Sequence, residues 1–218
     1  MGITLDDITL HHTGHSGFLI ETKTVNIYID PFKLTTLPAE QLDYLKAHKA
    51  TFIITTHTHN DHLSPEDIAL IEDENTIFIA PPCCKVLTTK PHYIKLCVGD
   101  VVTEKGIQFQ GVDAYNTNKN FHLKSMGFIG VIITINGKRI YHAGDTDVIE
   151  EMKTYTNLDV ALIPVSGTYV MTADEAIVAA GLIQSKCYVP MHWGIIIGDK
   201  AMAEHFVASV KGAILPSF

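Results

Sequence analysis

The sequence predicts an α/β fold in which helices cover β-sheets. Runs with strand character alternate with helical segments in the order strands, helix, strand, helix, strands, helix, strand, helix. Hydrophobic residues make up 46% and charged residues 18% of the chain, the balance of a packed globular protein. No linker rich in Gly, Ser or Pro divides the 218 residues, so we predict one domain over residues 1–218. This pattern is compatible with one sheet or with two stacked sheets.

The N-terminal half begins with short strands joined by turns. Apolar or β-branched runs separated by glycine or polar residues predict three strands: Ile8–His12, Gly17–Glu21 and Val25–Asp30. A helix is expected over residues 38–48, and a buried strand over residues 51–56 leads directly into His57. A second helix begins at Ser64, because Ser64 can cap it, Pro65 suits the first turn and the next two carboxylates favour the positive helix end.

The C-terminal half continues the same alternation. Further strands are expected at Thr76–Ala80, Tyr93–Val98, Ile107–Tyr115, Phe128–Ile135, Lys138–His142, Val160–Pro164 and Cys187–Met191. Asn136-Gly137 is the clearest hairpin signal in the chain. Residues 172–175 form a capping box that begins an Ala-rich helix ending near Ile183, and Asp199 can cap a last helix to about Lys211.

Charge, apolar runs and cysteine content restrict the expected partners and the expected location. The formal charge of −8, with no lysine-rich block, argues against a nucleic-acid partner. No stretch approaches about 18 uninterrupted apolar residues and the start lacks signal-peptide character, so no membrane partner is expected. The four cysteines form no C-x-x-C pair, so we interpret them as reduced thiols of a cytoplasmic protein. The sequence leaves a homo-oligomer open.

The strongest chemical signal is a cluster of histidines directly after the buried strand over residues 51–56. Four potential metal ligands fall within six residues: His57, His59, Asp61 and His62. A tight turn between a strand and a capped helix can direct several side chains into one space, and imidazole with carboxylate suits zinc, manganese or iron. A histidine-rich polar loop is the simpler alternative, but three histidines and an aspartate at this spacing favour a metal site.

Two later strand ends offer further ligands. Asp145 follows the strand over residues 138–142, and Gly144 allows the sharp turn that would expose it. His192 follows the strand over residues 187–191 in the same way. Three strand ends therefore deliver candidate ligands, and a carboxylate such as Asp145 can bridge two cations with its two oxygens.

Together these motifs resemble those of the metallo-β-lactamase fold superfamily. The H-x-H-x-D-H signature matches residues 57–62, and the G-D-T and P-M-H elements match residues 144–146 and 190–192. Gly14-His15-Ser16 with Asp30-Pro31-Phe32 is similar to the branch that contains L-ascorbate-6-phosphate lactonase and many metal-dependent hydrolases. The resemblance covers nearly the whole chain. It implies a four-layer αββα sandwich of two mixed sheets flanked by helices, with the metals at one edge between the sheets.

The resemblance also implies how two metal ions are shared among the ligands. His57 and His59 would bind the first metal, and Asp145 would bridge both. The second metal would take Asp61, His62 and His192. The family's third histidine on the first metal is absent, because Asn116 stands at that position. We expect Asn116 near the first metal, with His122 close enough to replace the missing histidine or to assist through water.

Three other residues have two interpretations each. His15 either lies near the metals, as the resemblance suggests, or is a hydrogen-bonded core histidine. Asp30 either orients a metal-bound histidine or is a turn residue before Pro31, and we favour the first. Lys119 either binds an anionic substrate group or is a solvated loop lysine, which is the commoner case.

The expected function is metal-dependent hydrolysis, in the manner of the lactonase-like branch. At a dinuclear site, a metal-activated water would cleave a lactone, ester or amide of a small molecule. Asp61 would orient the nucleophile and later take up a proton. The cofactors would be two divalent transition-metal ions per chain, zinc first, with manganese or iron as alternatives. A phosphodiesterase of the same fold and a non-catalytic metal-binding protein with a degraded first site are the alternatives.

Overall fold

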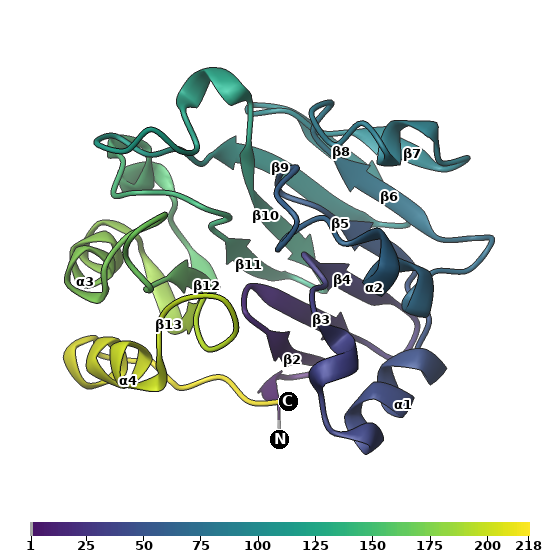
Figure 1. The fold of residues 1–218 in the computed structure, drawn as a ribbon, viewed down its shortest axis with the longest axis horizontal. Coiled ribbons are helices and arrows are strands. Elements are labelled where there is room, and N and C mark those ends of the chain that lie inside the picture. The colour runs from purple at the N-terminus through teal and green to yellow at the C-terminus, as the bar shows by residue number, and fades with distance from the viewer. Residues whose placement is uncertain (1) are drawn as a thin grey trace. The chain divides into compact units, whose positions relative to one another are not determined.

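The computed structural model describes residues 2–218, which divide into two compact units. The N-terminal unit contains residues 2–95 and 216–218, and the C-terminal unit contains residues 96–215. In this described part of the chain, each unit has one mixed β-sheet and two α-helices (Figure 1). This confirms the predicted fold class of two mixed sheets with flanking helices. One domain over residues 1–218 stays a prediction.

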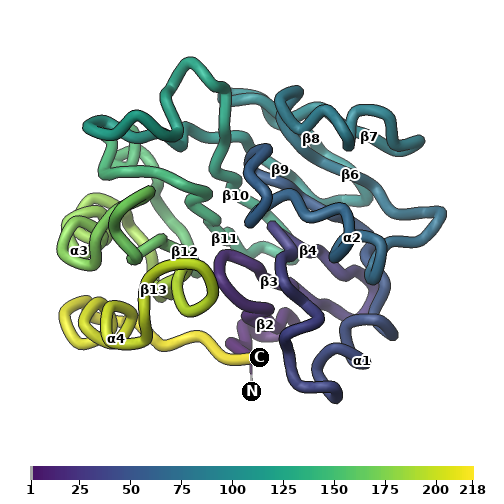
Figure 2. The backbone as a smooth tube through the Cα atoms, in the orientation of Figure 1, coloured from purple at the N-terminus to yellow at the C-terminus, as the bar shows by residue number. Residues whose placement is uncertain are grey.

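The sheet of the N-terminal unit follows chain order. Its strands are β1 (Ile3–Leu5), β2 (Ile8–Gly14), β3 (Gly17–Glu21), β4 (Asn26–Ile29), β5 (Phe52–Ile54), β6 (Ile77–Ala80) and β7 (Tyr93–Lys95). Strands β1 to β4 pair antiparallel, and β4 to β7 pair parallel. The C-terminal residues return to this unit, where Ser217 O accepts from His12 N of β2 at 3.1 Å (Figure 2).

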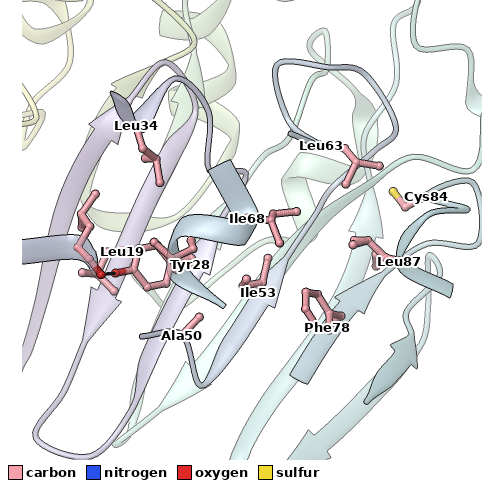
Figure 3. Packing of buried hydrophobic residues seen from close by; sticks show 13 residues of the cluster. Leu19, Tyr28, Leu34, Ala50, Ile53, Leu63, Ile68, Phe78, Cys84 and Leu87 are labelled. Carbon is pink, nitrogen blue, oxygen red and sulfur yellow. Dashed lines mark hydrogen bonds between the residues drawn. The ribbon is translucent and has the colours of Figure 1, made fainter. Parts of the chain in front are cut away.

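Two helices cover one face of this sheet, α1 (Ala39–Ala47) and α2 (Pro65–Ile71). Alternate strand positions supply a buried apolar layer that includes Tyr28, Ile53 and Phe78, to which α2 adds Ile68 (Figure 3). Fully burying a side chain of this size contributes about 1.5–3 kcal/mol. The Tyr28 hydroxyl donates to His48 O at 2.8 Å and so also holds the end of α1. The 3-10 turns η1 (Leu34–Thr36) and η2 (Leu87–Thr89) complete the unit.

The sheet of the C-terminal unit has the strand order β13-β12-β11-β10-β9-β8. The bounds are β8 (Val101–Glu104), β9 (Ile107–Asp113), β10 (Ile129–Ile135), β11 (Lys138–His142), β12 (Leu158–Pro164) and β13 (Ser185–Met191). The predicted hairpin is present, because Ile135 pairs with Lys138 and both residues between them have positive φ, 48° at Asn136 and 74° at Gly137. Strands β11, β12 and β13 are parallel, so their carboxyl ends share one edge of the sheet.

The helices of this unit are α3 (Ala173–Leu182) and α4 (Lys200–Ser209), and they pack against each other and against β12 and β13. Both begin where predicted. Thr172 and Glu175 form the complete capping box of α3, and Asp199 accepts from Met202 N at the start of α4. The 3-10 turns are η3 (Lys124–Met126) and η4 (Glu150–Thr154). Across residues 2–218, none of the helices combines the length and the apolar character needed to cross a membrane.

The structure differs from the predicted elements mainly at sheet edges. Strands β1 and β8 were not predicted, because each is an edge strand of three or four residues without a buried run. A turn at Lys105-Gly106, both with positive φ, joins β8 to β9 and was a readable hairpin signal. The strand predicted over residues 51–56 ends at Ile54, because Thr55 and Thr56 already belong to the loop that follows.

Candidate metal centre

The histidine cluster of the N-terminal unit lies in a tight turn between β5 and α2, as predicted. The amides of His62 and Leu63 both donate to His59 O, at 3.0 and 2.8 Å, and Ser64 then caps α2. Within the turn, His57 Nε2 lies 3.1 Å from His59 Nδ1, and the rings of His57 and His62 are 4.1 Å apart between centroids. The backbone hydrogen bonds therefore gather three imidazoles at the carboxyl end of one buried strand.

Asp30, at the end of β4, holds His62 in a defined orientation. Its Oδ2 lies 2.7 Å from His62 Nδ1, and both side chains are fully buried. The same carboxylate accepts from Thr56 N at 2.8 Å and from Thr56 Oγ1 at 2.7 Å. Because Nδ1–H donates to the carboxylate, Nε2 of His62 is the nitrogen left to bind a cation. Asp30 therefore makes the contact with a candidate metal ligand, His62, that the first of its two interpretations requires.

His15 lies beside Asp61 rather than in the apolar core. It follows Gly14 at the end of β2 with a φ of +53°, a conformation that few residues other than glycine adopt. Its Nε2 is 3.2 Å from Asp61 Oδ2. One ligand atom from each of His15, Asp61 and His62 falls within 4.8 Å of the others, a spacing that suits one cation. The N-terminal unit thus contains a three-residue cluster able to hold a metal ion.

Asp145 is the centre of a second cluster, in the C-terminal unit. It lies in the loop after β11, and His192 comes directly after β13, so the shared edge of the parallel strands brings the two together. His192 Nε2 is 3.2 Å from Asp145 Oδ2. His122 Nε2 is 3.1 Å from the same oxygen, and all three side chains are buried. His122 therefore points inward to Asp145, as expected if it assists in binding metal.

Asn116 is tied to His122 by its backbone and its side chain. Asn116 N donates to His122 O at 2.8 Å, and Nδ2 donates to Tyr169 O at 2.7 Å while lying 3.3 Å from His122 Nδ1. The amide nitrogen is thus committed as a donor, which leaves Oδ1 as the atom that could bind a cation. That oxygen is buried and has no hydrogen-bond partner in the described residues, which is unusual for a buried carbonyl oxygen.

One loop, residues 166–171 after β12, orients both histidines that flank Asp145. Ser166 Oγ lies 2.8 Å from His192 Nδ1, and Tyr169 O lies 3.2 Å from His122 Nδ1. Each oxygen can accept the Nδ1–H, so Nε2 of each ring, which faces Asp145 Oδ2, is the nitrogen that could bind a metal. The donor set therefore fits a transition metal, because metal-binding histidines commonly donate their other ring N–H to a protein oxygen.

Sequence reasoning missed three of these residues: Thr56, Ser166 and Tyr169. A signal existed for Ser166, since it follows the strand ending at Pro164 just as Asp145 follows β11. No signal marked Tyr169, because its contribution is a backbone carbonyl, which any residue supplies.

Lys119 stabilises its loop through an ion pair with an aspartate. Its Nζ forms an ion pair with the buried Asp147, which also accepts from Thr117 N at 2.9 Å. This ion pair occupies the ammonium group that the sequence offered as a site for an anionic substrate group.

A cavity of about 620 Å³ opens in the N-terminal unit beside the histidine turn. It shares Asn60 and Leu63 with that turn, and its wall also includes Phe32, Lys33 and residues of α2. Space for a small molecule therefore exists next to the N-terminal cluster.

Known proteins of similar sequence and structure were found. The sequence model of a protein family, the beta-lactamase superfamily domain, matches residues 9–192 of this chain. The chain is 31% identical over 194 residues to a UPF0173 metal-dependent hydrolase of Lawsonia intracellularis, covering 83% of this chain and 81% of the relative. The crystal structure of a protein from Parabacteroides distasonis, described as a "putative metal-dependent hydrolase", has a TM-score of 0.83 and 29% identity, over 97% of this chain and 93% of that chain. Igni18, a metallo hydrolase of Ignicoccus hospitalis, has a TM-score of 0.77 and 28% identity, over 97% and 94%.

Proposed function

Because this chain belongs to the beta-lactamase superfamily, we propose that it is a metal-dependent hydrolase that binds two divalent transition-metal ions. One observation carries the proposal. His62, His122 and His192 each have Nδ1 within hydrogen-bond distance of a protein oxygen, on Asp30, Tyr169 and Ser166 respectively. A histidine held in this way has its tautomer and ring direction set for metal binding.

The proposed ligands follow the order of the sequence motifs. His57 and His59 would hold the first ion, and Asp145 would contact both ions. The second ion would be held by Asp61, His62 and His192. His122 would take the place of the missing histidine on the first ion, with Asn116 Oδ1 as a weaker ligand beside it. The contact of His122 with Asp145 supports this assignment, and so does the unpartnered oxygen of Asn116.

When bound, such cations lower the pKa of a coordinated water toward neutrality and polarise the bond to be broken. The chain's own residues would direct this chemistry. Asp61 would orient the attacking water and then take up a proton, since its carboxylate is half-buried among the histidines of the turn and lies 3.2 Å from His15 Nε2. Asp30, Ser166 and Tyr169 would keep the histidines from rotating.

The proposed substrate is a lactone, ester or amide of a small molecule. Zinc is the proposed metal, with manganese or iron as alternatives, because imidazole and carboxylate ligands suit all three. A phosphodiester is a weaker candidate, since the loop cation Lys119 is already paired with Asp147. We further propose a cytoplasmic location, because all four cysteines are free thiols.

The test combines metal analysis with a substrate panel. Protein purified without chelator and then reconstituted is expected to retain up to two transition-metal ions per chain by elemental analysis. The same preparation is expected to hydrolyse at least one lactone, ester or amide, and to lose that activity in EDTA. Failure to bind metal would refute the proposal. Stoichiometric metal without turnover on esters, lactones, amides or phosphodiesters would favour a non-catalytic metal-binding protein.

A further inference from the structure

Two aromatic side chains stand exposed next to the Asp145 cluster. Phe121 is 47% and Tyr169 37% exposed, and their rings meet edge to face with centroids 5.1 Å apart. Phe121 immediately precedes His122, and the backbone oxygen of Tyr169 lies 3.2 Å from His122 Nδ1. The aromatic pair is therefore attached at two points to a candidate metal ligand, Phe121 through the peptide bond and Tyr169 through its backbone oxygen.

Both rings are carried by restrained backbone. The Tyr169 loop is closed by hydrogen bonds from Gly167 N to Met171 O and from Val170 N to Gly167 O, at 2.8 and 2.9 Å. Thr168 has a φ of +40°, a strained conformation that the loop maintains. His122, next to Phe121, has a φ of +55°. A strained and closed loop that displays an aromatic ring to solvent is typical of a functional segment.

A second apolar segment follows the other histidine of the cluster. Ile195 and Ile196 come three and four residues after His192 and are both exposed. Their loop packs on the Tyr169 loop, since a Cβ added to Gly198 would lie only 2.6 Å from Ser166 Cβ. The two loops therefore touch at Ser166, whose hydroxyl contacts His192.

Residues 116–123, 166–171 and 192–198 carry no unpaired cationic side chain. Lys119 is the single lysine among them, they contain no arginine, and the ammonium group of Lys119 is paired with Asp147. A phosphate or sulfate group would thus find no lysine or arginine to bind on these segments, whereas an apolar group would find large apolar side chains. Substrate pockets of enzymes are lined mostly by apolar and aromatic groups around a few polar ones.

We propose that Phe121, Tyr169, Ile195 and Ile196 form an apolar rim that binds the acyl or aryl part of a neutral ester or lactone. This inference rests on the proposed hydrolase function and narrows its substrate class. The occupant is the apolar part of the substrate, because all four residues lie on segments that carry or orient His122 and His192. The rim would select long-chain or aromatic substrates over short or phosphorylated ones.

The test is a p-nitrophenyl ester series of increasing acyl length, with acetate, butyrate and octanoate, on the metal-reconstituted protein. Wild type is expected to prefer octanoate to acetate in kcat/KM by tenfold or more. The ratio is expected to fall at least fivefold in Phe121→Ala and Tyr169→Ala, and to be retained in Tyr169→Phe, which keeps the ring. The matched control is Val178→Ala on α3, because Val178 is 57% exposed but lies outside the three segments. Its ratio is expected to equal that of wild type.

A binding readout separates this inference from the hydrolase proposal. Trp193 is the single tryptophan of the chain and lies between His192 and the two isoleucines. Titration with 2-decanone, a neutral probe that is not hydrolysed, is expected to shift its emission to shorter wavelength, more weakly in Phe121→Ala. No turnover of any ester, lactone or amide, together with this shift, would refute the hydrolase proposal and still support apolar binding at the rim.

Three results would contradict the proposal that these residues form a substrate-binding rim. The first is turnover with equal rates across the acyl series. The second is faster hydrolysis of bis-p-nitrophenyl phosphate than of any ester. The third is conversion of a dimer to a monomer in Phe121→Ala with acyl preference unchanged, because a second copy of the chain would then cover this surface.

Discussion

The contact between Asp30 and His62 can be tested by a substitution that keeps its shape. Asp30 accepts three hydrogen bonds, two from Thr56 and one from His62 Nδ1, all at 2.7–2.8 Å. In Asp30→Asn the amide has one oxygen and one NH₂ group, so the NH₂ must face either the Thr56 amide or His62. At least one donor of Thr56 or His62 then faces the NH₂ group of the asparagine, and no hydrogen bond forms between two donors. If that donor is His62 Nδ1–H, the ring loses the acceptor that holds its tautomer.

The expected loss follows from this geometry. Removing a partner that orients a metal-binding histidine typically weakens metal binding about 10–100-fold, which corresponds to about 1.4–2.7 kcal/mol. The assay is a competition titration of zinc against a fluorescent chelator, with urea unfolding of the metal-free protein measured in parallel. We expect Asp30→Asn to bind zinc at least tenfold more weakly than wild type.

Asp67→Asn is the matched control. Asp67 is also buried in the N-terminal unit and accepts from Lys33 N, Leu34 N and Ser64 Oγ, at 2.8, 2.9 and 2.6 Å, and these three hydrogen bonds involve no histidine. This variant is expected to unfold at lower urea and to retain the zinc affinity of wild type within about threefold. Wild-type zinc affinity in Asp30→Ala, which removes the acceptor of His62 altogether, or an equal loss in Asp30→Asn and Asp67→Asn, would refute the argument that Asp30 acts through His62.

The remaining predictions concern the C-terminal cluster and the pH dependence of stability. Asp145→Ala is expected to lose more bound metal than Asn116→Ala, by elemental analysis after dialysis, because Asp145 is the proposed shared ligand. Equal retention in the two variants would contradict this. His122→Ala is expected to weaken the binding of the first metal ion tenfold or more, about 1.4 kcal/mol, in the same zinc titration. A loss under threefold would leave His122 outside the set of ligands. Burial lowers the pKa of His12 to about 4, so the unfolded chain binds a proton between about pH 6.5 and pH 4 that the folded chain does not. Stability is therefore expected to fall by about 3 kcal/mol as the pH drops through that window, and His12→Gln is expected to reduce this dependence in urea unfolding at pH 7 and pH 4.5. An unchanged slope in that variant would show that another group carries the effect.

Most local features of the fold could be predicted from the sequence. The turn at Asn136-Gly137, the capping box at Thr172 and the capped start of α2 all lie where the pattern indicated. The ligand turn over residues 57–62 was equally readable, since its residues are neighbours in the chain. Such signals depend on contacts within four or five residues, where backbone preference and side-chain capping decide the conformation.

Two short strands, β1 and β8, were not predicted from the sequence. They are stabilised by pairing with a neighbouring strand rather than by a buried run of their own, so their existence depends on where that neighbour lies.

The sequence by itself therefore determined the class of fold, the superfamily and a turn of candidate metal ligands. Only the tertiary structure decided which residues orient these candidate ligands. Asp30 and His62 are 32 positions apart, Ser166 and His192 are 26 apart, and Asn116 and Tyr169 are 53 apart. These contacts depend on which strands are neighbours and in which register they pair, information that is spread over the whole sheet. His122 shows the same limit, because a loop of six residues after Asn116 could have turned outward, and its hydrogen bonds to Asn116 and Tyr169 turn it toward Asp145.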